Sequence, residues 1–370
     1  MSTALADDAE VVERILDHID HQTTDLSEAV WLEPVAHYTS PERFEAEIAK
    51  VLRRTPTPFC PSAALPEAGA YVARDAAMTP ILAVRGADGI VRAFRNACRH
   101  RGTQLVEGSG CKKAFACPYH AWTYGLDGAL RGVPQEHGFP GLDKASHGLV
   151  PVKTVEAHGL IFVTQDEPAA EADPVPDLIG PDWRLIKTAA QEIPANWKIV
   201  TEGVLEGYHI RATHAETFYP RQYDNLNVVE VFGRGSRVTY PYRNIEKLRG
   251  AEPSDRSTAG RVTQVYHLFP NAALATFPTH VAMLVFEPLA IDRTRVVTYT
   301  LTGRSDAEED RAVVAKGQAF ANQGAIEDRA VQSAVQRGLA ARANEVFTFG
   351  LFEGAIRHFH QTLAEALGPD

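Results

Sequence analysis

Two short stretches decide what this chain of 370 residues can be: Cys98-Arg99-His100-Arg101-Gly102 and Cys117-Pro118-Tyr119-His120. Each pairs one cysteine with one histidine, and sixteen residues lie between His100 and Cys117. Thiolates bind zinc or the iron of iron–sulfur clusters, and imidazole is a borderline ligand that suits both. A zinc finger groups cysteine with cysteine and histidine with histidine, whereas each stretch here mixes the two. The stretches therefore predict a site to which each loop gives one thiolate and one imidazole.

Such a ligand set is that of a Rieske [2Fe–2S] centre, in which two histidines replace two cysteines on one iron. The expected cluster ligands are Cys98, His100, Cys117 and His120. A single structural zinc held by the same residues is the alternative. The two other cysteines, Cys60 and Cys111, are interpreted as ordinary small residues.

The composition is that of a globular protein in a reducing compartment. Hydrophobic residues make up 45%, and there are 4 cysteines, 14 histidines and a formal net charge of −10. Four cysteines are too few to staple a secreted chain of this length. The acidic balance argues against nucleic acid as the main partner. No apolar run reaches the roughly 18 residues that span a bilayer, and no targeting peptide is visible. We expect a cytoplasmic protein without a membrane partner.

The order of short strands and helices predicts an α+β fold of about two domains. Residues 8–20 have helical periodicity, and Ser40-Pro41 is typical of a helix start leading into residues 44–52. Residues 56–164 form short β-rich runs with Asp-Gly breaks, including a hairpin over 81–94.

The second half of the chain has a different pattern. Residues 165–176, rich in Ala, Pro and acids, suit a linker. After it we expect one helix over about 197–211, a set of strands over about 228–297, and helices over about 306–367.

A second group of candidate metal ligands lies in the run from Asn196 to His214. His209 and His214 are five residues apart, which separates them by about 140° on an ideal helix. We therefore expect His214 to lie past the helix end, where the chain can turn it back. Two imidazoles with one carboxylate make a facial triad for Fe(II) that leaves positions open for O2. Spacing alone leaves the carboxylate open among Glu202, Glu206, Glu216, Glu327 and Asp328.

Both groups resemble the catalytic α subunit of the Rieske non-haem iron oxygenases, the aromatic ring-hydroxylating dioxygenase family. Cys98–Gly102 and Cys117–Trp122 are similar to its two Rieske loops, and Asn196-Trp197-Lys198 is similar to the start of its mononuclear-iron motif. The resemblance covers about residues 31–367. It implies an all-β Rieske module followed by an α+β helix-grip (START-like) catalytic domain with an antiparallel sheet. The implied parts are an N-terminal helical segment packing on the catalytic domain (1–40), the Rieske domain (41–165) and the catalytic domain (166–370).

The resemblance also implies roles for single residues. His209 and His214 would hold the mononuclear iron together with Asp328, which takes the ligand position of the family's C-terminal helix. Asn196 is a further catalytic candidate. Glu206 stands where the family usually has an Asp that bridges the two metal sites between subunits. Spacing places Glu206 on the helical face of His209.

The glutamate at position 206 is one methylene longer than the usual aspartate and resembles members that oxidise quaternary amines, such as carnitine monooxygenases. The family assembles as a head-to-tail ring of three, so we expect a homotrimer in which His120 donates through Glu206 towards His209.

The activity implied by the resemblance is hydroxylation or demethylation of a small organic, aromatic substrate. The mononuclear iron would use O2 and electrons from a separate reductase, with or without a ferredoxin. No G-x-G-x-x-G opens a helix, so NAD(P)H would act only through that reductase. One alternative is a carnitine- or choline-like quaternary-amine monooxygenase, which an aromatic cage without strong anionic sites would favour. A second, from another class, is a Rieske electron-transfer protein without a catalytic iron.

Two further features are less specific. Candidate pocket residues, each more simply explained as core, are Phe218, Tyr219, Phe269, Phe277, Met283 and Phe286. The tract Arg357-His358-Phe359-His360 is interpreted as a helix face with solvent-exposed or hydrogen-bonded histidines.

Overall fold

The computed structural model describes residues 5–169 and 173–368, and these form two compact units. The first unit contains the described residues up to 52, residues 173–175, and those from 182 onward; the second contains residues 53–169 and 176–181. Each unit holds a seven-stranded sheet whose pairs are antiparallel, and helices accompany the sheet of the first unit. The predicted α+β fold is confirmed, while the predicted domain boundaries stay predictions.

The second unit is an all-β module. Its main sheet has the strand order β2-β11-β10-β5-β4-β3-β6, and a smaller sheet has the order β7-β8-β9. The strands are β2 Thr57–Pro61, β3 Ala70–Ala76, β4 Thr79–Arg85, β5 Val91–Arg95, β6 Gly108–Cys111, β7 Phe115–Ala116, β8 Thr123–Tyr124, β9 Leu130–Gly132, β10 Pro151–Ala157 and β11 Leu160–Thr164. Short 3₁₀ helices span Ser62–Ala64, Glu136–Gly138 and Lys144–His147.

The hairpin predicted over residues 81–94 forms from β4 and β5, with Ala83 opposite Ala93. Gly89 in its turn has a φ of 78°, which a side-chain-bearing residue adopts only at a cost. Strands β8 and β9 form a further antiparallel pair, with Tyr124 opposite Leu130.

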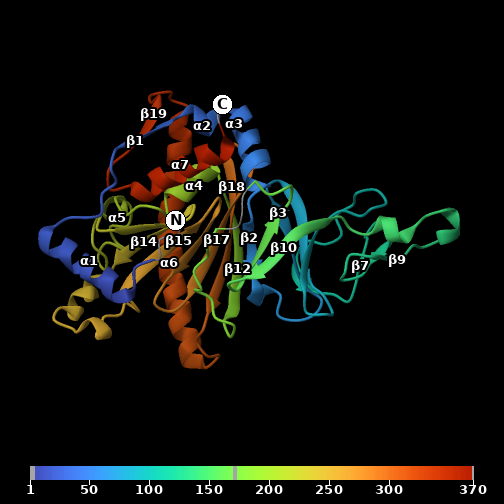
Figure 1. The fold of residues 1–370 in the computed structure, drawn as a ribbon, viewed down its shortest axis with the longest axis horizontal. Helices are drawn as coiled ribbons and strands as arrows, with labels where there is room; N and C mark the ends of the chain where they lie inside the picture. The colour runs from blue at the N-terminus through green and yellow to red at the C-terminus, as the bar shows by residue number, and fades with distance from the viewer. Residues whose placement is uncertain (1–4, 170–172, 369–370) are drawn as a thin grey trace. The chain divides into compact units, whose positions relative to one another are not determined.

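The first unit is built on a sheet with the order β12-β18-β17-β16-β15-β14-β13 (Figure 1). Its strands are β12 Arg184–Ile193, β13 Val228–Phe232, β14 Gly235–Pro241, β15 Val262–Leu268, β16 Ala272–Thr276, β17 Val281–Ala290 and β18 Arg293–Thr302. A separate two-stranded sheet joins β1 Trp31–Pro34 to β19 Val346–Phe349.

Helices from the ends and the middle of the chain accompany this sheet. They are α1 Asp8–His21, α2 Ala36–Thr39, α3 Pro41–Ala46, α4 Trp197–Glu202, α5 Ile210–Thr213, α6 Glu308–Leu339 and α7 Gly354–Leu367, with a π-helical segment Glu47–Leu52 and 3₁₀ segments Arg243–Leu248 and Pro253–Asp255. Helix α4 contacts β17, β18 and α6, while α7 contacts β13 and β14 (Figure 1). Within the described residues, no helix combines the length and apolar character needed to cross a membrane.

The two predicted helix starts near the N-terminus are confirmed. Asp7 and Glu10 form a capping box at the start of α1, and Val11, Val12 and Ile15 are buried. At the start of α3, Ser40 Oγ accepts a hydrogen bond from the Arg43 N–H at 3.1 Å.

The single helix predicted over residues 197–211 is wrong. Helix α4 ends at Glu202, α5 begins only at Ile210, and turns connect them. A Cβ added at Gly207 would lie 2.4 Å from Asn227 Oδ1, so the chain passes too close to its neighbour there for any side chain. Glycines at 203 and 207 also weaken a helix, by about 1 kcal/mol each. Glu206 therefore shares no helical face with His209.

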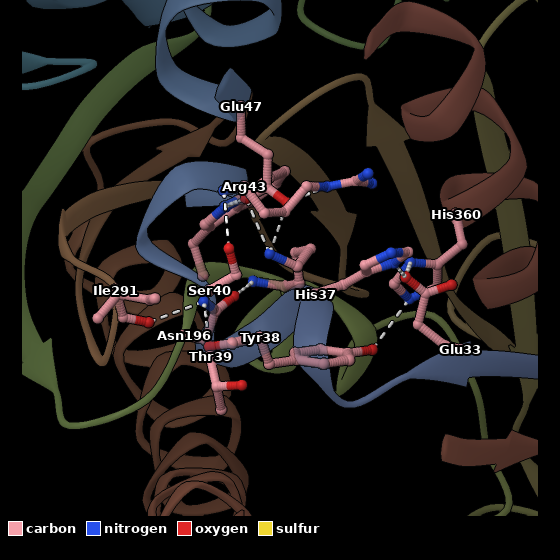
Figure 2. Close-up of polar contacts among 12 residues, drawn as sticks. Glu33, His37, Tyr38, Thr39, Ser40, Arg43, Glu47, Asn196, Ile291 and His360 are labelled. Carbon is pink, nitrogen blue, oxygen red and sulfur yellow. Dashed lines mark hydrogen bonds and ion pairs between the residues drawn. The ribbon is translucent and has the colours of Figure 1, made fainter. Parts of the chain in front are cut away.

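A fully buried ion pair anchors α4 to the π-helical segment. Lys198 Nζ lies 2.8 Å from both carboxylate oxygens of Glu47, and neither side chain is exposed. The same carboxylate accepts hydrogen bonds from Trp197 Nε1 at 2.8 Å and from Arg43 Nε at 3.2 Å. Figure 2 shows Glu47 facing Arg43 across this cluster. Burial lowers the pKa of Lys198 and Glu47 opposes that effect.

Replacing Lys198 with methionine is expected to lower the free energy of unfolding by about 3–5 kcal/mol, because Glu47 stays buried without its cation. Denaturant unfolding followed by fluorescence measures the change. The double variant Lys198→Met/Glu47→Leu removes both charges and should recover most of the loss. If the single variant unfolds at the same denaturant concentration as the wild type, the hydrogen bonds from Arg43 and Trp197 are enough to stabilise the buried Glu47 carboxylate.

Candidate functional site

The two Cys–His stretches of the second unit form loops that close in the same way. The carbonyl of Cys98 accepts from the Gly102 N–H at 2.8 Å, and that of Cys117 accepts from the Ala121 N–H at 2.9 Å. In each loop the cysteine N–H donates to the carbonyl five residues further on, at 2.8 Å. Gly102 and Ala121 both have a positive φ, 79° and 56°. The backbone closure is therefore the same in both loops, although the histidine follows its cysteine by two residues in one and by three in the other.

The side chains of the loops suit a buried cluster. Cys98 and Cys117 are each 4% exposed, and the rings of His100 and His120 lie 4.8 Å apart. In the described ranges, the one group that brings three His, Cys, Asp or Glu donor atoms within 4.8 Å of one another lies in the first unit. The four donors of the loops therefore do not converge on one point, as a tetrahedral zinc would require. Donors spread over two metal atoms fit a [2Fe–2S] cluster.

Aromatic side chains surround these ligands. Trp122, which is 2% exposed, stacks on His100 with centroids 4.9 Å apart, while Tyr119 lies 3.7 Å from the His120 ring. Tyr124 was not predicted to take part: its Oη lies 3.2 Å from Cys98 Sγ. Burial, followed by the bond to Cys98, raises the pKa of Tyr124, so its hydroxyl remains a donor. Hydrogen bonds to cluster sulfurs tune the reduction potential.

The two remaining cysteines lie in strands of the same unit. Cys60 is buried in β2, and burial raises the pKa of its thiol to about 12. Cys111 is exposed in β6, where its thiol lies 3.6 Å from the Ala68 carbonyl. Both are free thiols in the structure.

The first unit brings His209, His214 and Asp328 together, with one donor atom from each within 4.8 Å of the others. Asp328 Oδ1 lies 3.0 Å from His214 Nε2 and 3.5 Å from His209 Nε2. The two imidazole centroids are 5.0 Å apart. His214 follows the last residue of α5, as predicted, and Asp328 comes from α6. Two neutral imidazoles and a carboxylate are the donor set of a mononuclear Fe(II) site.

Glu206 holds His209 from the turn that precedes α5. One carboxylate oxygen pairs with His209 Nδ1, and the other accepts from the backbone N–H groups of Tyr208 and His209. Burial disfavours the charged imidazole, but the bond to Glu206 and the charges of Glu206 and Asp328 raise the pKa of His209. Because Glu206 occupies Nδ1, the Nε2 atom of His209 faces Asp328. A hydrogen bond to the non-ligating nitrogen commonly orients a metal-binding histidine in this way.

Glu327 holds the second histidine, a role that spacing had left open. Its Oε2 lies 2.7 Å from His214 Nδ1 and accepts from Thr217 Oγ1 at 2.6 Å. Glu327 and Asp328 are consecutive on α6, and one contacts Nδ1 while the other contacts Nε2 of the same imidazole. Glu327 therefore orients His214, and Asp328 is the carboxylate at the convergence point.

Asn196, Glu202 and Glu216 stand apart from this point. Asn196 caps α4: its Oδ1 accepts from the Lys198 N–H at 3.0 Å and its Nδ2 donates to the Ile291 carbonyl at 2.7 Å. Figure 2 shows Asn196 directed at Ile291. Glu202 bonds to Tyr38 and His360 instead of facing the two histidines. None of these three is among the described residues that line the cavity below.

A cavity of about 270 Å³ opens beside the triad and is lined by Glu206, His209, His214 and Asp328 themselves. Its aromatic lining residues are Phe218, Tyr240, Phe277 and Phe286. Three of these were candidates from the sequence, whereas Tyr219, Phe269 and Met283 are not among the lining residues.

Two aromatic residues of the lining are held by contacts with other lining residues. The Tyr240 hydroxyl donates to the Val204 carbonyl at 3.0 Å. The His280 ring stacks on Phe277 with centroids 4.8 Å apart, and burial lowers the pKa of His280 to about 4, so it is neutral at pH 7.

Comparison with sequence families identifies both parts of the chain. The family described as "Ring hydroxylating alpha subunit (catalytic domain)" matches residues 181–368, and that described as "Rieske [2Fe-2S] domain" matches residues 55–154.

Two curated relatives extend over most of the chain and a third over half of it. The carnitine monooxygenase oxygenase subunit of Escherichia coli (strain K12) is 28% identical over 365 residues, covering 90% of this chain and 93% of the relative. The chloroplastic choline monooxygenase of Beta vulgaris is 27% identical over 357 residues, covering 90% and 76%. The glycine betaine monooxygenase oxygenase subunit of Chromohalobacter salexigens is 35% identical over 192 residues, covering 50% and 43%.

Solved structures share the fold. A quaternary ammonium Rieske monooxygenase in complex with L-carnitine superposes with a TM-score of 0.76 at 23% identity, covering 93% of this chain and 97% of that one. Naphthalene 1,2-dioxygenase with indole bound gives 0.76 at 20% identity, covering 91% and 92%. At these identities the superpositions establish the fold alone.

Replacing Asp328 with alanine is expected to remove the mononuclear iron and product formation while the visible absorbance of the cluster stays intact. Iron analysis should fall from roughly three to roughly two atoms per chain, with sulfide unchanged at about two. The matched variant Glu327→Ala keeps all three proposed ligands and should weaken iron binding by about 10–100-fold without abolishing it. Turnover that survives in Asp328→Ala would show that another carboxylate is the ligand.

Proposed function

The chain belongs to the ring-hydroxylating α subunits that carry a Rieske domain, and from this membership we propose that it oxidises a small quaternary amine. It is a Rieske-type oxygenase with a [2Fe–2S] cluster, a mononuclear non-haem iron and O2 as cosubstrate. Such α subunits work with a reductase. The alternative of an electron carrier without a catalytic iron is wrong, because the catalytic family matches residues 181–368.

The names of the relatives support the quaternary-amine alternative better than the aromatic substrate expected first. Carnitine, choline and glycine betaine, the compounds in these names, each carry a quaternary ammonium group. The glutamate at position 206, where the family usually has aspartate, points the same way.

The observation that carries the proposal is the lining of the cavity. Aromatic rings attract cations through their faces, and the attraction grows when water is excluded. Phe218, Tyr240, Phe277 and Phe286 line the same cavity as the triad. Its only carboxylates among the described lining residues are Glu206 and Asp328, which are held at the histidines. A methylated ammonium group would thus meet aromatic rings and one acidic end, in a lining that also holds the cations Lys187 and Arg329.

The residues of the site divide the work between them. When bound, the cluster supplies electrons and the mononuclear iron activates O2. His209, His214 and Asp328 would hold that iron, while Glu206 and Glu327 fix the Nδ1 side of each imidazole. The cavity walls, which mix aromatic and aliphatic side chains with polar ones such as Gln191 and Asn322, would orient the substrate.

We further propose a head-to-tail homotrimer, with Glu206 as the bridge between the cluster of one subunit and His209 of the next. The structure of one quaternary ammonium Rieske monooxygenase of similar fold is described as giving insight into inter-subunit electron transfer in that protein. In this chain the Glu206 carboxylate is 12% exposed and already bound to His209. Sedimentation should give about three times the mass of one chain.

A substrate panel tests the proposal directly. Carnitine, γ-butyrobetaine, choline and glycine betaine are each incubated with the iron-loaded chain, a surrogate reductase and O2, beside benzoate and other aromatic acids. We expect oxidised product in step with O2 consumption from at least one quaternary amine. Coupled product from the aromatic acids alone would contradict the proposal. A compound that yields peroxide without product gives uncoupled turnover and is not the substrate.

Substituting Phe218 by leucine is expected to raise KM for the accepted quaternary amine by roughly 5–30-fold, equivalent to about 1–2 kcal/mol. The Phe218 ring lines the cavity and packs edge-on against His214, with centroids 4.7 Å apart. The matched control Phe320→Leu removes a ring that contacts Phe218 but is not among the lining residues. An uncharged analogue, with carbon in place of the quaternary nitrogen, should inhibit Phe218→Leu and Phe320→Leu equally. If Phe218→Leu loses affinity for that analogue as it does for the amine, the cation–π role is refuted.

A further inference from the structure

Two cations in the wall of the cavity have no anion bound to them. Lys187 of β12 and Arg329 of α6 both line it, and neither forms a hydrogen bond or an ion pair with a residue that the structure describes. Asp328 is close enough to interact electrostatically with Arg329, but its Oδ1 faces the two imidazoles of the triad. Glu206, the other carboxylate of the described lining, is bound to His209. The wall therefore offers positive charge to an anion from outside the chain.

Arg329 lies beside the triad, on the side of α6 that meets β12. It follows Asp328 directly, and consecutive helical residues are turned by about 100° around the axis. It shares its face with Gln336, seven residues further on. Gln336 Oε1 accepts from the N–H of Asn196, three residues beyond the end of β12, at 2.8 Å. Arg329 thus lines the cavity where α6 contacts β12, the edge strand of the sheet (Figure 1).

Lys187 lies towards the opposite end of α6. Arg184, three residues before it in β12, pairs at 3.0 Å with Asp306, two residues before α6 begins. From the first residue of α6 to Asp328 the helix rises by about 30 Å. Lys187 is also exposed, whereas Arg329 is half-buried. A small substrate with a methyl group at the triad therefore reaches Arg329 with its other end, and not Lys187.

We propose that Arg329 binds a carboxylate of the substrate and so selects betaines, which carry a carboxylate as well as a quaternary ammonium group. The ammonium group lies among the aromatic rings and beside the acidic end formed by Glu206 and Asp328, and the carboxylate pairs with the guanidinium on the β12 side. This inference rests on the proposed quaternary-amine function and deepens it, because it separates betaines from quaternary ammonium alcohols such as choline.

The chemistry of the side chains on this side of the cavity suits a carboxylate. A guanidinium pairs with a carboxylate through two parallel N–H···O bonds and is less strongly hydrated than an ammonium group. Gln191 of β12 and Asn322 of α6 also line the cavity. Asn322 precedes Arg329 by seven residues and shares its face of the helix. Each amide has N–H donors for the same anion.

Calorimetry on the resting holoenzyme, without reductase, tests the role of Arg329 with matched pairs of compounds. Glycine betaine is compared with choline, and γ-butyrobetaine with 4-hydroxybutyl-trimethylammonium, so that the members of a pair differ only in a carboxylate or a hydroxymethyl group. The wild type should bind at least one acid more tightly than its alcohol, by roughly 10–100-fold. Arg329→Met should lose that preference and keep its affinity for the alcohols. Arg329→Lys should keep part of it, because the charge remains while the paired N–H donors are lost.

The matched control is Arg337→Met. Arg337 is an exposed arginine of the same helix that is not among the described lining residues, so its loss should leave the preference unchanged. Iron content and cluster absorbance of Arg329→Met should equal those of the wild type. Equal losses for acid and alcohol would show that Arg329 only supports the fold or the triad, and would overturn the inference. A preference lost in Lys187→Met but kept in Arg329→Met would do the same.

The substrate panel decides the proposed function separately from this binding measurement. If no quaternary amine is oxidised but the tighter binding of the acids depends on Arg329, the proposed substrate is refuted and the carboxylate site stands. A wild type that binds each acid no more tightly than its alcohol would overturn the carboxylate site, whichever quaternary amine it oxidises.

Discussion

The catalytic unit depends on the contacts that α6 makes with both nitrogens of a single imidazole, that of His214. Glu327 and Asp328 are consecutive, yet they contact opposite nitrogens of His214. A slip of one residue in the register of α6 would turn both carboxylates by about 100° and break both contacts. The helix must therefore be fixed along its axis as well as around it.

Close packing through two glycines fixes that register. A Cβ at Gly324 would lie 2.3 Å from the Phe218 ring, and one at Gly317 would lie 2.3 Å from Thr279 Oγ1. The two glycines are seven residues apart and so share one face of α6. Each weakens the helix by about 1 kcal/mol relative to alanine. The close approach they allow seats Phe218 against His214, so the wall of the cavity and the metal-binding residues are set by the same contacts.

The sequence was informative wherever the chemistry is local. Cys98 and His100 are two residues apart, so their shared loop and mixed ligand character could be inferred from spacing, as could the position of His214 past a helix end. The roles of Glu327 and Tyr124 could not, because each depends on a partner from a distant segment. Strand β12 was also missed: its side chains are largely exposed on both faces, so it lacks an apolar alternation. The β1–β19 sheet joins the two ends of the chain and is invisible to local patterns.

The interior of the catalytic unit is acidic beside the triad, and this links its functions. Burial raises the pKa of Glu353 to about 7, and the charges of Glu206 and Glu202 add to that effect. In a medium of low dielectric such a group of carboxylates favours cations. A divalent metal compensates part of the negative charge of these carboxylates. A quaternary ammonium substrate would compensate more of it and has no N–H proton to donate. The same carboxylates also favour bound protons: burial and their charges raise the pKa of Glu353, and although burial disfavours a charged His360, its bond to Glu202 raises the pKa of that imidazole.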